Sequence, residues 1–321
     1  MACSSSSSSC MLVLVVLAVS AQLAAPALSP GYYSRTCPNL ENIVRGVVAQ
    51  DKDANIKVIG STIRLFFHDC FVEGCDGSVL IDSTAGNRAE KDADDNKFLS
   101  GFATVRSAKA AVEAACPGTV SCADILTIAT RDAIALSGGP FYPVELGRLD
   151  GLSSSASSVK GKLPHPTDTI DQMVAIFKAH GLTMSQMVAL SAAHSVGQAH
   201  CDKFSDRLYG NPPDRTLNPT YAAFLRSQCP AGGSPNPVVM DQATPAQFDN
   251  QYYKNLRDGG GLLASDQLLY TDNRTRTDVD AWAASPAAFS QAFVDAIVKL
   301  GRVGVKSGSK GNIRKQCNVL N

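Results

Sequence analysis

The sequence predicts a mainly α-helical globular protein that is held together by disulfide bonds. Stretches with helical apolar periodicity cover much of the chain, strand signals are few, and ten cysteines accompany an apolar N-terminal run. The 321 residues are enough for a buried core and for about two subdomains. With 29 basic and 29 acidic side chains, the composition argues against a nucleic-acid-binding surface, and 45% hydrophobic residues argue against intrinsic disorder.

The N-terminus carries the pattern of a secretion signal. Residues 11–19 form an apolar run that is too short to cross a bilayer and is followed by small residues and a proline. We therefore expect residues 1–27 to be a signal peptide that is cleaved after Ala21 or Ala27, where small-x-small stretches end. The first ten residues contain no Lys or Arg, so a leader on a cytosolic protein is the alternative. No later segment is apolar for long enough to anchor the chain in a membrane.

Nine segments have the pattern of a helix, and the best strand candidate is the short segment 141–146. In chain order, the expected helices are residues 41–54, 58–70, 104–115, 121–137, 169–179, 183–192, 220–228, 248–257 and 288–300. Residues 153–158 and 231–237 are of low complexity and are expected to be surface loops. No internal repeat and no clear linker divides the chain.

Caps and breakers give the fourth expected helix its boundaries. Ser121 followed by Asp124 resembles a capping box, with Asp in the place of the usual Glu or Gln. Two glycines and a proline at 138–140 then end this helix. In the last expected helix, Phe293, Ile297 and Leu300 share one face, which predicts that this face is buried.

Eight cysteines remain once a leader with Cys3 and Cys10 has been removed. An even number of cysteines in an oxidising compartment predicts up to four disulfides, but eight cysteines allow roughly a hundred pairings, and spacing does not choose among them. A zinc site around His68, Cys70 and Cys75 is a weak alternative, because structural zinc sites usually show paired C-x₂₋₄-C halves.

Two segments place a histidine at the end of an expected helix. Arg64 and His68 are four residues apart and share one helix face, so a general base lies beside a group that can stabilise departing negative charge. His194 is flanked by small residues that let a planar cofactor approach, and it is a candidate axial haem ligand. Taken alone, a histidine in either segment is more often a satisfied core residue than a functional one. No function is expected for the histidines in loop-like or surface contexts, which are His165, His180 and His200.

These segments and six ordered motifs resemble the secreted plant haem peroxidases, also called class III peroxidases. The resemblance covers nearly the whole mature chain, from Tyr32 to Cys317. It implies the haem peroxidase fold for residues 28–321, with one haem b between a distal half, about 28–165 plus the C-terminal segment, and a proximal half, about 166–290. The motifs are RLFFHDCFVEGCD at 64–76, EKDA at 90–93, VSCAD at 120–124, LSAAH at 190–194, FDNQYY at 248–253 and SDQ at 265–267.

The resemblance implies a catalytic group on the distal side. His68 would take a proton from hydrogen peroxide and pass it to the leaving oxygen, while Arg64 would stabilise the charge that develops as the O–O bond breaks. Asn96 would hydrogen-bond the distal histidine and keep its far nitrogen basic. Glu90 and Phe67 complete the group, with Phe67 as an apolar wall.

The resemblance also implies the proximal side and the reaction. His194 would be the iron ligand, and Asp266 would accept its N–H and give the imidazole anionic character. Hydrogen peroxide would be reduced to water while two small phenolic donors each lose one electron. The carbonyl of Pro164 matches a contact with these donors.

Two calcium sites follow from the same resemblance, and their hard oxygen ligands suit this ion. The first would consist of Asp69, Val72, Gly74, Asp76 and Ser78. The second would consist of Ser195, Asp241, Thr244, Gln247 and Asp249. Because Asp69 follows His68 and Ser195 follows His194, each calcium would brace a catalytic histidine. Without the resemblance, a solvated turn is the alternative for such loops.

The family pattern pairs all eight mature cysteines, as Cys37–Cys116, Cys70–Cys75, Cys122–Cys317 and Cys201–Cys229. The sequence also has one N-glycosylation sequon, at Asn273.

Departures from the family pattern leave the catalytic groups intact. They are Ser195 in the place of Thr, Ala192 and Ala193 in the place of Gly, Leu149 and Ser100 in the place of Arg, Asp95 in the place of Pro, and Lys203 at a family-variable position near the substrate entrance.

Two other classes of function are weaker. A haem- and calcium-binding wall protein with low turnover should lack Arg64, His68 or Asn96, and all three are present. A hydrolase would need a nucleophile, but there is no G-x-S-x-G elbow and no cysteine left unpaired. We therefore expect a monomeric peroxidase secreted to the cell wall or apoplast, with no nucleic-acid or membrane partner.

Overall fold

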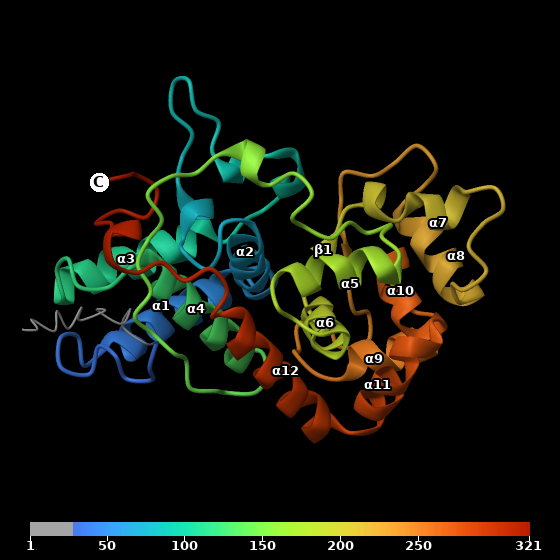
Figure 1. The fold of residues 1–321 in the computed structure, drawn as a ribbon. Helices are drawn as coiled ribbons and strands as arrows, with labels where there is room; N and C mark the ends of the chain where they lie inside the picture. The colour runs from blue at the N-terminus through green and yellow to red at the C-terminus, as the bar shows by residue number, and fades with distance from the viewer. Residues whose placement is uncertain (1–27) are drawn as a thin grey trace, which may run out of the picture.

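The computed structural model describes residues 28–321 (Figure 1), so the expected signal peptide and its two cleavage points lie outside the described residues. The described chain is mainly helical, as expected, with one antiparallel pair of two-residue strands, β1 (Gln198–Ala199) and β2 (Val238–Val239). The α-helices are α1 (Leu40–Ala54), α2 (Val58–Val72), α3 (Phe102–Ala115), α4 (Cys122–Leu136), α5 (Ile170–Ala179), α6 (Met184–Ser191), α7 (Ser205–Tyr209), α8 (Pro219–Gln228), α9 (Gln251–Arg257), α10 (Ala264–Thr271), α11 (Asn273–Ala284) and α12 (Pro286–Leu300).

The helices form two groups that lie side by side (Figure 1). Helices α1 to α4 pack against one another on one side, and α5, α6 and α9 to α11 lie on the other. Helix α12 packs against α6, and the chain then returns to the first group. Helix α2 is buried along most of its length, because it lies between α4 and the second group.

A close contact between two glycines joins α2 to the second group. A Cβ atom at Gly60 would lie 2.8 Å from the Cα atom of Gly197, which is too close for any side chain. Gly197 also has φ +95°, a conformation that favours glycine. Because Gly60 lies one turn before Arg64, and Gly197 lies three residues after His194, this contact brings the two histidine segments together.

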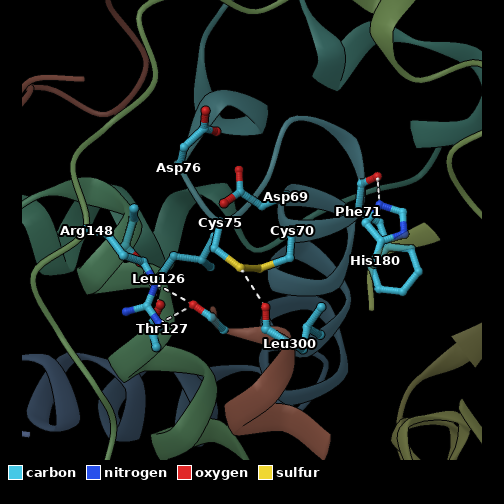
Figure 2. Close-up of a disulfide and its surroundings, with 12 residues drawn as sticks. Asp69, Cys70, Phe71, Cys75, Asp76, Leu126, Thr127, Arg148, His180 and Leu300 are labelled. Carbon is cyan, nitrogen blue, oxygen red and sulfur yellow. Dashed lines mark hydrogen bonds between the residues drawn. A yellow bond between two sulfur atoms is a disulfide. The ribbon is translucent and has the colours of Figure 1, made fainter. Parts of the chain in front are cut away.

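Four disulfides connect the eight cysteines of residues 28–321 in the pairing that the family resemblance implies. They are Cys37–Cys116, Cys70–Cys75, Cys122–Cys317 and Cys201–Cys229. Cys122 lies at the start of α4, so the bond to Cys317 ties the C-terminal segment to the first helix group. Figure 2 shows the Cys70–Cys75 disulfide at the end of α2, with Asp69 and Asp76 on one side of it.

His180 is a contact between the two groups rather than a solvated side chain. It lies at the C-cap of α5, and its Nε2 atom is 2.9 Å from the carbonyl oxygen of Phe71 in α2 (Figure 2). Its ring also stacks on the Phe71 ring, with centroids 4.3 Å apart. These contacts explain why this histidine is half-buried.

The expected strand at 141–146 is wrong. Its alternating pattern is real, because Tyr142, Val144 and Leu146 are buried while Phe141 is exposed. However, Pro143 has no N–H to donate to a neighbouring strand, and the segment makes only an isolated bridge, from Leu146 to Ser29. It is an extended segment that covers the first helix group.

The expected capping box at the start of α4 forms only in part. The Ser121 side chain accepts a hydrogen bond from the Asp124 N–H at 3.1 Å, as predicted. The Asp124 carboxylate does not bond back to the helix start. It instead accepts hydrogen bonds from Tyr33 and Arg148, each at 2.8 Å. Tertiary partners therefore outcompete the local cap.

Three helices were not expected from the sequence, namely α7, α10 and α11. The sequence of helix α11 is mostly polar, because only one face of this helix is buried. That face includes Thr275, Val279 and Trp282. Helix α9 begins three residues later than expected, because Phe248 and Asp249 lie in the segment before it.

Within residues 28–321, no single helix is long and apolar enough to cross a membrane, although the bent pair α5–α6 matches by length and composition alone.

Candidate active site

A cavity of about 840 Å³ lies between α2 and the segment that follows α6. One wall, which we call the His68 wall, consists of Arg64, Phe67 and His68. The opposite wall, which we call the His194 wall, consists of His194 and Asp266 together with small neighbours. The two histidines that the sequence singled out therefore face one cavity, and its volume falls in the range of small-molecule and cofactor sites.

Asn96 determines which nitrogen of His68 is free. The Asn96 amide donates to the Glu90 carbonyl at 2.7 Å, so its Oδ1 atom faces His68 Nδ1, 2.6 Å away. An amide oxygen only accepts hydrogen bonds, so Nδ1 carries the proton and Nε2 keeps its lone pair. Burial, followed by the nearby Arg64 charge, lowers the pKa of His68 to about 3. At neutral pH, His68 is thus an uncharged base.

Arg64 lies one helical turn from His68 and lines the same cavity. Burial lowers the pKa of its guanidinium, and no carboxylate among the described residues offsets this effect. A guanidinium still carries its charge under such conditions, because its ordinary pKa is above about 12. The His68 wall therefore combines a neutral proton acceptor with a positive charge that is not neutralised by a partner.

His194 lies in the short 3-10 helix Ala192–Ser195 that continues α6. Its Nδ1 atom is 2.8 Å from Oδ1 of Asp266, which lies in the first turn of α10 and is buried. Burial lowers the pKa of His194, but the charge and hydrogen bond of Asp266 outweigh burial, and the net pKa is raised. The His194 side chain keeps 42% of its surface exposed because it faces the cavity. The nitrogen that remains for a ligand is Nε2.

Glu90 does not face the cavity. Its carbonyl oxygen holds Asn96, whereas its side chain is buried and neither carboxyl oxygen has a hydrogen-bond partner. Burial, followed by the charge of Asp69, raises the pKa of Glu90 to about 9. Glu90 therefore contacts Asn96 through its backbone carbonyl and not through its side chain.

The expected first calcium ligands include Asp69 and Asp76, whose charges act on the buried Glu90 carboxyl. Asp69 accepts hydrogen bonds from the Gly77 and Val79 N–H groups at 2.9 and 3.3 Å, and the Ser78 hydroxyl is buried without a partner. Burial and the neighbouring charge of Asp76 raise the pKa of Asp69 well above its usual value. Within the described part of the chain, the one cation paired with these acids is Lys306, 3.4 Å from Asp76. Such a cluster favours a bound cation.

The expected second calcium ligands also come together. Ser195 donates to the Gln247 carbonyl at 2.9 Å and accepts from the Asp249 N–H at 3.2 Å. The Thr244 hydroxyl lies 3.3 Å from both Asp241 and Asp249. Among residues 28–321, no group of three or more His, Cys, Asp or Glu side chains forms a metal centre. Both expected sets rely instead on two acids with carbonyl and hydroxyl oxygens.

The mouth of the cavity holds residues that the sequence did not indicate. Pro164 and Lys203 both line the cavity, and Lys203 is exposed. Phe98 is the one non-glycine residue among those described with a positive φ, +64°, and half of its surface is exposed. Its ring stacks on His200 with centroids 4.0 Å apart. His200, for which no function was expected, therefore lies at the entrance.

A second missed residue is Tyr252, in the FDNQYY motif. Its hydroxyl donates to Oδ1 of Asp266 at 2.9 Å, the same oxygen that His194 contacts. The motif was recognised from the sequence, but nothing local shows which of its side chains reaches Asp266.

Comparisons with known proteins match this chain to one family. A family model described as "Peroxidase" matches residues 44–285. Peroxidase 51 of Arabidopsis thaliana is 51% identical over 320 residues, which cover 97% of this chain and 97% of that protein. Peroxidase 50 is 49% identical over the same coverage, and Peroxidase 73 is 48% identical over 303 residues, 92% of each chain; both come from the same plant.

Proposed function

Because this chain belongs to the class III peroxidases of plants and is a haem peroxidase, we propose that it reduces hydrogen peroxide to water with electrons from small phenolic donors. The observation that carries this proposal is a single cavity with a neutral His68 on one wall and a carboxylate-bonded His194 on the other. The first wall suits proton transfer, and the second suits iron ligation.

The residues present fit haem b. The cavity has the size of a cofactor site, and Asp266 holds the His194 ring so that Nε2 is the nitrogen left for iron. When bound, haem would supply the iron that exchanges electrons with peroxide and with the donors. The chain's own part is to hold the iron and to move protons.

Proton transfer at the His68 wall follows from its geometry. Nε2 of His68 accepts a proton from one oxygen of hydrogen peroxide and returns it to the other oxygen, which leaves as water. Arg64 stabilises the negative charge on the departing oxygen. Overall, one peroxide and two donor molecules give two waters and two donor radicals, so protons and electrons balance.

The absorbance spectrum of the folded, disulfide-bonded protein tests the proposal. We expect a haem Soret band that falls and shifts with one equivalent of hydrogen peroxide and recovers when guaiacol is added. A Soret band that is indifferent to peroxide would favour the alternative of a haem-binding wall protein with low turnover. The absence of a Soret band in haem-replete material would overturn the proposal.

The reaction with peroxide should be insensitive to pH down to strongly acidic conditions. His68 has a pKa of about 3, so it stays a free base above that pH. Stopped-flow rate constants should be flat from pH 8 to about 4 and fall about tenfold per pH unit below about 3. A fall centred near pH 6.5, the ordinary pKa of histidine, would contradict the environment described for His68.

The same pKa shift has a consequence for stability. Because the folded state keeps His68 neutral, the unfolded state binds an extra proton between about pH 6.5 and about 3. The contribution of His68 therefore lowers the free energy of unfolding as pH falls through this window.

Two calcium ions are proposed for the Asp69–Ser78 and Ser195–Asp249 clusters. The support is a buried hydroxyl without a partner, two acids in each set, and a fixed arrangement of oxygen atoms. We infer that each ion braces the histidine next to its cluster.

Chelation should therefore reduce activity several-fold. It should also lower the melting temperature, because calcium at a free concentration of about 100 times its Kd adds about 2.7 kcal/mol to the free energy of unfolding. Turnover and thermal unfolding should be measured before and after verified calcium removal, and again after calcium is restored. Magnesium, which prefers a smaller octahedral site, serves as the control and should not restore activity. Unchanged activity in calcium-free protein would count against the bracing role.

We also propose that the protein is secreted, glycosylated and monomeric. Four disulfides and the N-terminal apolar run support export to the cell wall or apoplast, with cleavage of residues 1–27 after Ala21 or Ala27. Asn273 is exposed at the start of α11 and is the proposed glycosylation site. Haem would lie between a distal half, about 28–165 with the C-terminal segment, and a proximal half, about 166–290.

A further inference from the structure

Asp266 receives more hydrogen bonds than the bond to His194 alone. Its Oδ1 atom lies 2.8 Å from His194 Nδ1 and 2.9 Å from the Tyr252 hydroxyl. Its Oδ2 atom accepts the Leu263 N–H at 3.2 Å. Asp266 and Tyr252 are 2% and 4% exposed, so water has little access to this oxygen. Two donors therefore share one buried carboxylate oxygen.

The direction of these hydrogen bonds follows from their chemistry. An ionised carboxylate only accepts, so both His194 Nδ1–H and the Tyr252 O–H must donate to Oδ1. Burial, followed by the charge of Asp266, raises the pKa of Tyr252 well above its usual value, so the phenol keeps its proton. The two rings meet edge to face, with centroids 6.4 Å apart.

We propose that Tyr252 is a positioning residue that tunes the haem iron through Asp266, by sharing the oxygen that accepts the N–H of His194. Charge-assisted hydrogen bonds are strong because the acceptor carries a full charge, and a second donor takes part of that charge. With the Tyr252 bond present, His194 is less anionic and gives less electron density to iron than Asp266 alone would allow. This inference rests on the proposed ligation of iron by His194.

The test is the substitution Tyr252→Phe in the haem-loaded enzyme, which removes one hydroxyl and keeps the ring. We expect the iron–histidine stretching frequency of the reduced protein to rise. We also expect the Fe(III)/Fe(II) potential to fall, by at most about the 59 mV that a tenfold change represents for one electron. Unchanged frequency and potential would overturn the proposal.

The neighbouring tyrosine provides a matched control. Tyr253 is equally buried, and its hydroxyl donates to the Val188 carbonyl at 3.1 Å instead of to Asp266. Tyr253→Phe should lower stability without moving the potential. If both variants shift the potential equally, the effect belongs to packing, and the proposal fails.

Two further measurements keep the test decisive. If Tyr252→Phe does not fold, 3-fluorotyrosine at position 252, a stronger donor, should shift the potential upward, and no shift would refute the role. In an Asp266→Asn background, Tyr252→Phe should lose its effect, because the two groups act through one bond. The absence of any iron–histidine band in the parent enzyme would instead refute ligation by His194, which separates the two failures.

Discussion

Replacing His68 by alanine should slow the reaction with hydrogen peroxide by about 10²- to 10⁴-fold while haem stays bound. General acid–base catalysis by a positioned side chain contributes this much, which corresponds to about 3 to 5 kcal/mol in the barrier. The loss should be large because His68 has a free Nε2 atom, a pKa of about 3 and no other uncharged base beside it on its wall. The rate constant is measured from the Soret change under stopped flow.

His200→Ala is the matched control for this prediction. His200 lines the same cavity but stacks on Phe98 at the mouth, so it is not placed beside Arg64. Its loss should leave the rate of the peroxide reaction within a few-fold of the parent. A near-normal rate for His68→Ala, or an equal loss in both variants, would remove His68 from the role of base.

Replacing His194 by alanine should have the second large effect, which is loss of haem or a changed spin state. Asp266 orients His194 so that Nε2 is left for iron, and no other residue of that wall pairs an imidazole with a buried carboxylate. Haem content per protein and the visible spectrum measure the effect. Imidazole added to the variant should restore part of the parent spectrum, because it can occupy the vacated space.

His165→Ala provides the comparison, since His165 also lines the cavity but lies in the loop after Pro164. This variant should bind haem with the parent spectrum. If His194→Ala keeps an unaltered spectrum, another residue ligates the iron, and the inference on Tyr252 loses its basis as well.

Local patterns were enough to predict most helices and the types of chemistry. Apolar periodicity placed the long helices within a few residues, because it depends on neighbours three and four positions apart. The same spacing placed Arg64 and His68 on one face of α2. The disulfide pairing needed the family resemblance, because spacing left roughly a hundred possibilities open. The prediction of a strand at 141–146 failed because an alternating pattern indicates only which side chains are buried. A strand also needs a neighbouring strand to which it can hydrogen-bond.

Contacts between distant segments were decided only by the tertiary structure. Residue patterns alone identified His68 and His194 as candidates. Only the family resemblance named Asn96 and Asp266 as their partners, because these residues lie 28 and 72 positions away in the chain. Which oxygen or nitrogen each residue presents depends on how the helices pack, and no local pattern encodes that. The same holds for the Glu90 carbonyl and for the Tyr252 hydroxyl. The sequence by itself determined which chemical groups the protein has, whereas packing decided their tautomers, charges and partners.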